Sequence, residues 1–268
     1  MVSTFSHHCS LFDHDPNEWA LESLAPQLRK QMQRAELQTP GADVYAQMLR
    51  DLRALNVSPD QMITAMRNLP VHPGMIRGVK ALHSSRKVDT TFFLLSASNT
   101  LFVHTVLQHH GLQPPDGPQI FSEIVASPVK ISGTGSLELE RRPTRPELTD
   151  SLEQGCKTGC PANMCKWQEL DALLERHGGR RAFDRVIYVG ASEDGFCPVL
   201  KLEPHDIALI KEGKGLEKKV REQAAPKAGV HWWSSAWEME LLLKQLSGLP
   251  VPDVPSAVRN DSAANIVS

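Results

Sequence analysis

Short apolar runs alternate along the chain with longer stretches in which apolar residues recur every three to four positions. The short runs are rich in β-branched and aromatic residues, which is typical of buried strands. They occupy residues 2–5, 90–95, 123–126, 185–189 and 206–210. Helical periodicity is clear at residues 100–110, 165–177 and 235–246. This alternation predicts an α/β fold with a parallel sheet that helices cover on both faces.

A long interval separates the first two predicted strands, far longer than a strand–helix–strand crossover needs. It contains three helical patterns, "NEWALESLAPQLRKQMQ", "GADVYAQMLRDLRAL" and "SPDQMITAMRNL". In the third, Ser58 and Pro59 form a favourable N-cap and N1 pair. We therefore expect a helical cap at residues 15–86, inserted into a core of residues 1–14 and 87–249. Residues 250–268 are rich in Pro, Ser and Asn without periodicity, which predicts a disordered tail.

Composition narrows the classes of function. The net charge is −2, so no broad attraction to nucleic acid or anionic membrane is expected. No apolar run approaches the roughly 20 residues that span a bilayer, and "MVSTFSHHCSLFDHD" does not have the features of a secretory signal. Five cysteines form no disulfide-like framework. These features predict a cytoplasmic protein with neither nucleic-acid nor membrane partners.

Polar residues follow the predicted strands. In an open parallel sheet, ligands bind outside the carboxyl ends of the strands. The segments at these ends are "FSHHCS", "LSASNT", "ASPVK", "VGASEDGFCP" and "IKEGKG". Lys166 begins a predicted helix directly after "GCPANMC". We expect these segments to converge on one pocket.

A family resemblance extends over most of the chain, from about residue 5 to residue 246. It rests on the segments "EWALESLAPQLR", "LPVHPGMIRGVKAL", "LLSASNTLFV", "GCPANMCKWQEL" and "FDRVIYVGASEDGFCPVLKL". These segments resemble the phosphoethanolamine/phosphocholine and pyridoxal-phosphate phosphatases of the haloacid dehalogenase (HAD) superfamily. The resemblance implies a HAD-like Rossmannoid core with an inserted helical cap.

The resemblance also implies a specific phosphatase chemistry. In that family an Asp at the end of the first strand attacks phosphorus and becomes an aspartyl phosphate. A second Asp, two residues later, serves as acid and base. Acidic residues after the fourth strand hold Mg²⁺ together with the nucleophile. A Ser or Thr and a Lys bind the phosphoryl oxygens.

The first and fourth motifs of this chain depart from that pattern. Ser6 falls at the position of the nucleophile and His8 at that of the acid/base, so these are the candidate catalytic residues. Ala191 and Gly195 replace the metal-binding aspartates. Losing a nucleophile in a site whose parts act together costs about 10⁴ to 10⁶ in rate. The resemblance therefore points to a phosphatase relative with impaired chemistry.

The phosphate-binding half of the pattern is retained. Ser96 and Asn99 match the second motif and Lys166 matches the third, which makes them the candidate phosphate-binding residues. Asp13 and Asp15 match positions just beyond the first motif. We expect a pseudophosphatase that binds a small phosphorylated or anionic ligand, although Ser96 and Asn99 could instead cap the following helix.

No cofactor is expected from this arrangement. Mg²⁺ prefers several charged oxygen ligands, and it would bind here only if Glu193 or Asp194 rebuilt the site. A different metal, Zn²⁺ or Fe²⁺, is an alternative for the cluster formed by His7, His8, Asp13 and His14.

Two catalytic alternatives stay open. The chain could be an active hydrolase of a small phosphomonoester such as phosphoethanolamine, phosphocholine or pyridoxal phosphate. It could also be a repurposed catalyst in which His8 activates Ser6 and Asp13 orients His8, with Lys166 stabilising an oxyanion.

The remaining segments favour structural roles. Cys156, Cys160 and Cys165 have C-x3-C-x4-C spacing, which predicts packed thiols, with a zinc site as the alternative. Cys197 is expected to pack under its loop. Trp232, Trp233 and Trp237 are predicted to be core or helix-packing residues at the sheet edge. Residues 133–147 predict a hairpin or loop beside the pocket, and residues 211–222 a solvated helix.

Overall fold

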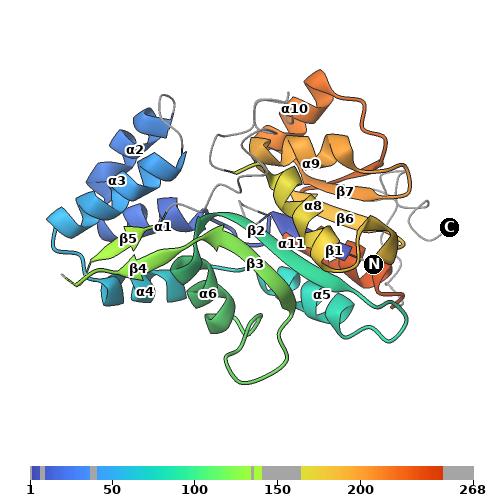
Figure 1. Cartoon of the computed structure of the whole chain (residues 1–268), viewed down its shortest axis with the longest axis horizontal. Coiled ribbons are helices and arrows are strands. Elements are labelled where there is room, and N and C mark those ends of the chain that lie inside the picture. Colours follow the sequence, from blue (N-terminus) through green and yellow to red (C-terminus); the bar gives the residue numbers. More distant parts are fainter. Residues whose placement is uncertain (1, 7–9, 37–40, 134–135, 141–163, 250–268) are drawn as a thin grey trace.

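The computed structural model of the chain (Figure 1) describes residues 2–6, 10–36, 41–133, 136–140 and 164–249. The tail predicted at residues 250–268 lies outside the described residues. Within the described part, no helix combines the length and the apolar character needed to cross a bilayer.

A six-stranded parallel sheet forms the centre of the molecule, with the strand order β3-β2-β1-β6-β7-β8. Its strands are β1 (Val2–Ser6), β2 (Thr91–Asn99), β3 (Phe121–Ser127), β6 (Val186–Gly190), β7 (Ile207–Lys211) and β8 (Gly229–Trp233). The first five lie where the apolar runs predicted strands. β8 was missed because its five residues, GVHWW, form a short apolar run that begins with glycine and is interrupted by histidine.

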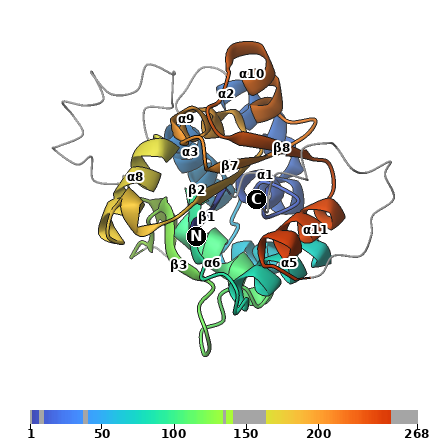
Figure 2. The same cartoon turned by 90° about the vertical axis from the view of Figure 1, so that its right-hand side faces the viewer.

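Helices cover both faces of this sheet, as the alternating pattern predicted (Figures 1 and 2). One face carries α5 (Pro73–His83), α6 (Thr100–His109) and α11 (Ala236–Leu246); the other carries α8 (Lys166–Arg176), α9 (Phe196–Lys201) and α10 (Gly215–Gln223). Phe92 and Leu94 pack in the first core, whereas Phe93 and Leu95 pack in the second. Successive side chains of β2 thus enter opposite cores, which explains its continuous apolar sequence.

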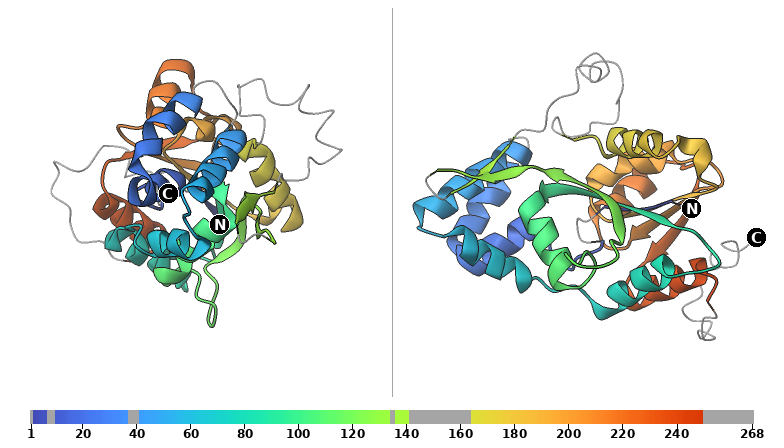
Figure 3. Two further views of the ribbon diagram at one scale, coloured as in Figure 1. Left: turned by 90° about the vertical axis from the view of Figure 1, so that its left-hand side faces the viewer. Right: turned by 60° about the horizontal axis from the view of Figure 1, so that its bottom comes forward.

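Four helices and a hairpin lie beyond one end of the sheet (Figures 1 and 3). They are α1 (Pro16–Leu24), α2 (Arg29–Glu36), α3 (Gly41–Ala54), α4 (Pro59–Arg67), β4 (Val129–Ile131) and β5 (Leu137–Leu139). Short 3₁₀ turns occur at Pro26–Leu28, Arg180–Ala182 and Glu193–Gly195. Ser58 caps α4 and Pro59 is its first residue, as the sequence predicted, and Gln61 completes a reciprocal capping box. Strand β5 pairs antiparallel with β4, so the segment 133–147 contributes one strand of a hairpin.

Helix α5 lies against α11 rather than with the helices that extend away from the sheet (Figures 1 and 2). The two helices approach closely at Gly78, where a Cβ atom would stand 3.1 Å from the Cα atom of Glu240. Arg77 donates two hydrogen bonds to Glu240, at 2.8 and 2.5 Å. Trp237 was predicted to pack inside, yet 56% of it is exposed and the Arg77 guanidinium stacks on its ring. The division into a core and a cap at residues 15–86 stays a prediction.

The Arg77–Glu240 contact gives a prediction about pH. Hydrogen bonds from Arg77 hold the pKa of Glu240 below its ordinary value of 4.5. This contact therefore stabilises the fold above about pH 4.5, and the stabilisation is lost as the pH falls through the lowered pKa of the folded state. We expect Glu240→Gln to unfold at lower urea concentration than the unmodified protein at pH 7, with the difference shrinking toward pH 3. Glu222→Gln, at an exposed position of α10, is the control; equal shifts for both variants would contradict this account.

Candidate functional site

The carboxyl ends of three neighbouring strands meet at one edge of the sheet. β1 lies between β2 and β6, and its last residue, Ser6, pairs with Leu95. On the other side Phe5 pairs with Val189. The last residues of β2, from Ser96 to Asn99, and the loop that begins at Ala191 therefore flank the end of β1. This arrangement brings the first, second and fourth sequence motifs together, as the resemblance implied.

The end of β2 is joined to the start of α1 by a short chain of buried polar contacts. The Ser96 hydroxyl accepts a hydrogen bond from the backbone N–H of Ser98, at 3.0 Å. The Ser98 hydroxyl in turn donates to Oδ1 of Asn17, at 3.1 Å. All three residues are buried. Asn17 was missed from the sequence because a polar residue in the first turn of a helix usually faces solvent.

Asn99 caps the helix that follows β2. Its Oδ1 atom accepts a hydrogen bond from the backbone N–H of Phe102, at 2.9 Å. Asn99 therefore acts as a helix cap, the alternative role that the sequence offered for it. The cap also fixes the N-terminus of α6 next to the end of β2, where the helix dipole favours negative charge.

Lys166 forms a buried ion pair with Asp194. Lys166 is the first residue of α8 and is 1% exposed. Its Nζ atom lies 2.7 Å from Oδ2 of Asp194, whose side chain is 18% exposed. The other carboxylate oxygen of Asp194 accepts a hydrogen bond from the hydroxyl of Ser192. The loop after β6 therefore turns one of its two carboxylates toward Lys166.

The second carboxylate of this loop points elsewhere. Glu193 packs on Gly215 at the start of α10, where a Cβ atom would lie 2.6 Å from Cγ and 3.1 Å from Oε1 of Glu193. The backbone N–H of Leu216 donates to the carbonyl oxygen of Ala191, at 3.0 Å, and holds the loop against α10. The two weak candidates for metal ligands thus lie against different neighbours.

The donor set of this loop does not fit the Mg²⁺ ion that the fold family implies. Ala191 offers no side-chain oxygen, and a Cβ atom at Gly195 would lie 2.8 Å from the Tyr188 hydroxyl, so a longer side chain there requires rearrangement. Asp194 already binds the ammonium of Lys166. Among the described residues, no group of three or more His, Cys, Asp or Glu side chains could hold a metal ion.

The other candidates near the first motif are spread apart or lie outside the described residues. Asp15 caps α1 through hydrogen bonds from the N–H groups of Asn17 and Glu18. Asp13 is exposed, and the ring of His14 packs against that of Trp19. His7 and His8 fall outside the described residues, so the proposed Ser–His and histidine-metal sites stay untested.

Two cysteines meet beside the ion pair. Cys165 immediately precedes Lys166, and its sulfur lies 3.8 Å from that of Cys197 on α9. Both thiols are buried, in keeping with the packing expected for Cys197. Cys156 and Cys160 lie outside the described residues. These sulfurs pack the start of α8 against the segment that carries Asp194.

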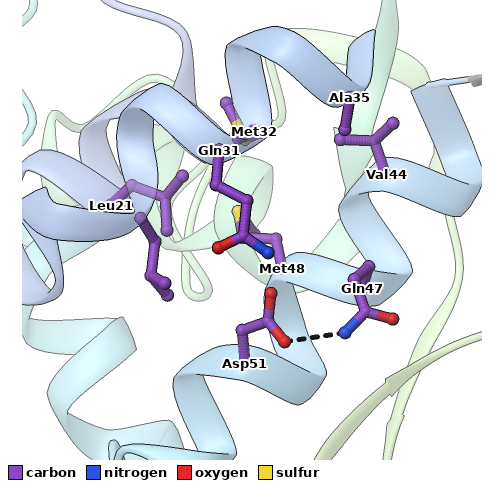
Figure 4. Close-up of a pocket in the computed structure, with 9 residues that line it drawn as sticks. Leu21, Gln31, Met32, Ala35, Val44, Gln47, Met48 and Asp51 are labelled. Atoms are coloured by element: carbon purple, nitrogen blue, oxygen red, sulfur yellow. Dashed lines mark hydrogen bonds between the residues drawn. The ribbon is translucent and has the colours of Figure 1, made fainter. Parts of the chain in front are cut away.

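The cavities among the outer helices do not include this edge of the sheet. Figure 4 shows an apolar cavity of about 40 Å³ lined by residues such as Leu21, Met32 and Met48. This volume admits water but not a phosphorylated metabolite. Larger recesses, of about 350 and 300 Å³, adjoin α4 and β5. None of these cavities is lined by a residue from the strand ends.

Comparison with known proteins decides the family. Residues 1–247 match the family described as "Putative Phosphatase". The chain belongs to this phosphatase family. Over 92% of its length it is 27% identical to a thiamine phosphate phosphatase-like protein of Arabidopsis thaliana, covering 95% of that protein. It is 30% identical to the protein named "Probable phosphatase phospho1" of Danio rerio, covering 74% of this chain and 69% of that protein.

The fold of this phosphatase-family chain is that of the HAD superfamily. A phosphoserine phosphatase solved as an analogue of its phospho-aspartyl intermediate superposes with a TM-score of 0.57. The superposition covers 90% of this chain and 96% of that one, at 12% sequence identity. The expected fold class and superfamily are therefore confirmed, whereas the roles of individual site residues stay proposals.

The buried ion pair gives a stability prediction for this phosphatase-family chain. Asp194→Ala leaves the buried ammonium of Lys166 without this carboxylate, so we expect a loss of about 3 kcal/mol in the free energy of unfolding. Lys166→Met should cost less, because the remaining carboxylate keeps contact with water. The double variant should be more stable than Asp194→Ala alone. Urea unfolding of all three variants completes a double-mutant cycle. Equal free energies of unfolding for Asp194→Ala and the double variant would show that the buried charge of Lys166 does not need Asp194 to balance it.

Proposed function

We propose that this protein binds a small phosphorylated or anionic molecule at the carboxyl edge of β1, β2 and β6 without forming an aspartyl phosphate. The observation that carries this proposal is the combination of a buried ammonium, Lys166, with a β1 strand that ends in Ser6 and a β6 loop that begins with Ala191. Lys166 offers a positive charge to an anion, and the described residues offer no carboxylate at the end of β1 for nucleophilic attack.

Three features support anion binding at this edge. The ammonium of Lys166 supplies a charge, the N-terminus of α6 supplies the positive end of a helix dipole, and Ser96 supplies a hydroxyl. In this proposal the three groups act together at the carboxyl edge of the sheet, because recognition of a phosphoryl group requires several donors at one place.

Catalysis by the family's mechanism requires a carboxylate nucleophile at the end of β1, and this chain has Ser6 there. A serine hydroxyl at the end of β1 is a weaker nucleophile than a carboxylate unless a base activates it. The family resemblance places Ser6 at the position of the nucleophilic aspartate, and a serine there cannot form an aspartyl phosphate. We therefore favour binding without the family's covalent intermediate.

An active phosphomonoester hydrolase is the second candidate. Similarity to a thiamine phosphate phosphatase-like protein over 92% of the chain favours it. In one form of this alternative, Ser6 acts as the nucleophile and His8 as the acid/base. In another, Asp194 moves away from Lys166 and binds a metal ion. The substrate would be a small phosphomonoester such as thiamine monophosphate, phosphoethanolamine, phosphocholine or pyridoxal phosphate.

Phosphate release separates the two candidates. Purified protein is incubated with p-nitrophenyl phosphate, phosphoethanolamine, pyridoxal phosphate and thiamine monophosphate, each with and without Mg²⁺. We expect release no faster than that of Ser6→Ala and Lys166→Ala, because the first and fourth motifs have no aspartates. Mg²⁺-dependent release that disappears in Lys166→Ala would establish the active hydrolase instead.

Calorimetric titration with inorganic phosphate tests binding on the same protein. We expect binding by the unmodified protein and a loss of at least about tenfold in affinity for Lys166→Ala, because a charge-assisted hydrogen bond is removed. Lys201→Ala, on the exposed face of α9, is the matched control and should bind as the unmodified protein does. Equal affinity in all three proteins would contradict a role for Lys166.

A further inference from the structure

The carboxylate is the more exposed member of the Lys166–Asp194 pair. Lys166 is 1% exposed, whereas the Asp194 side chain is 18% exposed. A molecule that approaches from solvent therefore has more access to the carboxylate than to the ammonium. The positive charge of Lys166, which would attract an anion, is therefore balanced by the negative charge of Asp194.

The contacts of Asp194 resemble those that a bound anion would make. One carboxylate oxygen lies 2.7 Å from the ammonium of Lys166. The other accepts a hydrogen bond from the hydroxyl of Ser192. An ammonium and a hydroxyl are also the kind of donors that bind the oxygens of a phosphoryl group. The side chain of Asp194 thus takes the place of an anion on these donors.

We propose that Asp194 sets the affinity and charge preference of the site by competing with ligand anions for Lys166. This inference rests on the proposed function, since it presumes that ligands bind at Lys166. An incoming anion must displace the carboxylate from Lys166 or bind beside it. In the first case the Lys166–Asp194 contact is lost, and in the second two negative charges lie close together. Both effects weaken binding, and the repulsion between the two negative charges is larger for a dianion than for a monoanion.

The neighbouring residue provides a control of equal charge. Glu193 belongs to the same loop, but its side chain packs on Gly215 at the start of α10. Glu193→Gln removes one negative charge from the loop without removing the carboxylate from Lys166. A comparison with Asp194→Asn therefore separates competition for Lys166 from the general charge of the loop.

Titration with inorganic phosphate, followed by calorimetry and by the ligand-induced rise in melting temperature, tests this inference. We expect Asp194→Asn to bind phosphate at least about tenfold more tightly than the unmodified protein, because an amide carries no opposing charge. Glu193→Gln should differ by less than about twofold, since its charge lies away from Lys166. Asp194→Asn with Lys166→Ala should lose the gain. Equal or weaker binding by Asp194→Asn than by the unmodified protein overturns the inference.

A second variant keeps the test decisive if Asp194→Asn folds poorly. Ser192→Ala retains both charges of the ion pair but removes the hydroxyl that holds Asp194 in place. It should tighten phosphate binding by roughly twofold to fivefold, the scale of one hydrogen bond to a partly exposed carboxylate. No tightening in Ser192→Ala would count against competition by Asp194.

The outcomes also separate this inference from the proposed function. If the unmodified protein binds phosphate through Lys166 and the Asp194 variant gains nothing, only the competition fails. If neither the unmodified protein nor Asp194→Asn nor Ser192→Ala binds phosphate, anion binding at this edge fails, and the inference with it.

Discussion

A buried ammonium requires a counter-charge, and this requirement organises the functional end of the molecule. Lys166 is almost wholly buried at the start of α8, where isolated positive charge would be costly. Asp194 supplies the opposite charge from the loop after β6, and Ser192 holds that carboxylate by its second oxygen. Two segments separated in sequence are thereby fixed to each other across the edge of the sheet.

The rest of the edge follows from the sheet that carries it. β1 is central, so the ends of β1, β2 and β6 are brought together by the strand order alone. The helices on the two faces bury alternate side chains of β2 in separate cores, which fixes the direction in which the loops leave the strands. The packing of Glu193 on Gly215 and the bond from Leu216 to Ala191 then hold the loop after β6 against α10. The position of Asp194 is therefore a consequence of packing on both sides.

The fold that this chain shares with its phosphatase family depends on packing rather than on the charges at its strand ends. The fold requires apolar strands, helix caps and close packing of the loops, and these are present. A shared fold does not by itself determine chemistry, because the groups that react are placed on the fold rather than required by it. At this edge the buried lysine at the start of α8 is balanced by a carboxylate from the loop after β6.

The sequence by itself determined the α/β fold, five strands of the sheet, the main helices and the superfamily, because apolar periodicity and local motifs are recorded in consecutive residues. It also placed Ser96 and Asn99 near the end of the second strand and Lys166 at the start of a helix. It did not show β8, whose short apolar run is interrupted by His231, or the exposure of Trp237, which depends on how α11 lies on α5. Only the tertiary structure decided that Asp194 pairs with Lys166 while Glu193 packs on Gly215, and that Asn17 accepts a hydrogen bond from Ser98 near the end of β2. The directions of neighbouring side chains in a loop are set by contacts between distant segments, and no local pattern encodes them.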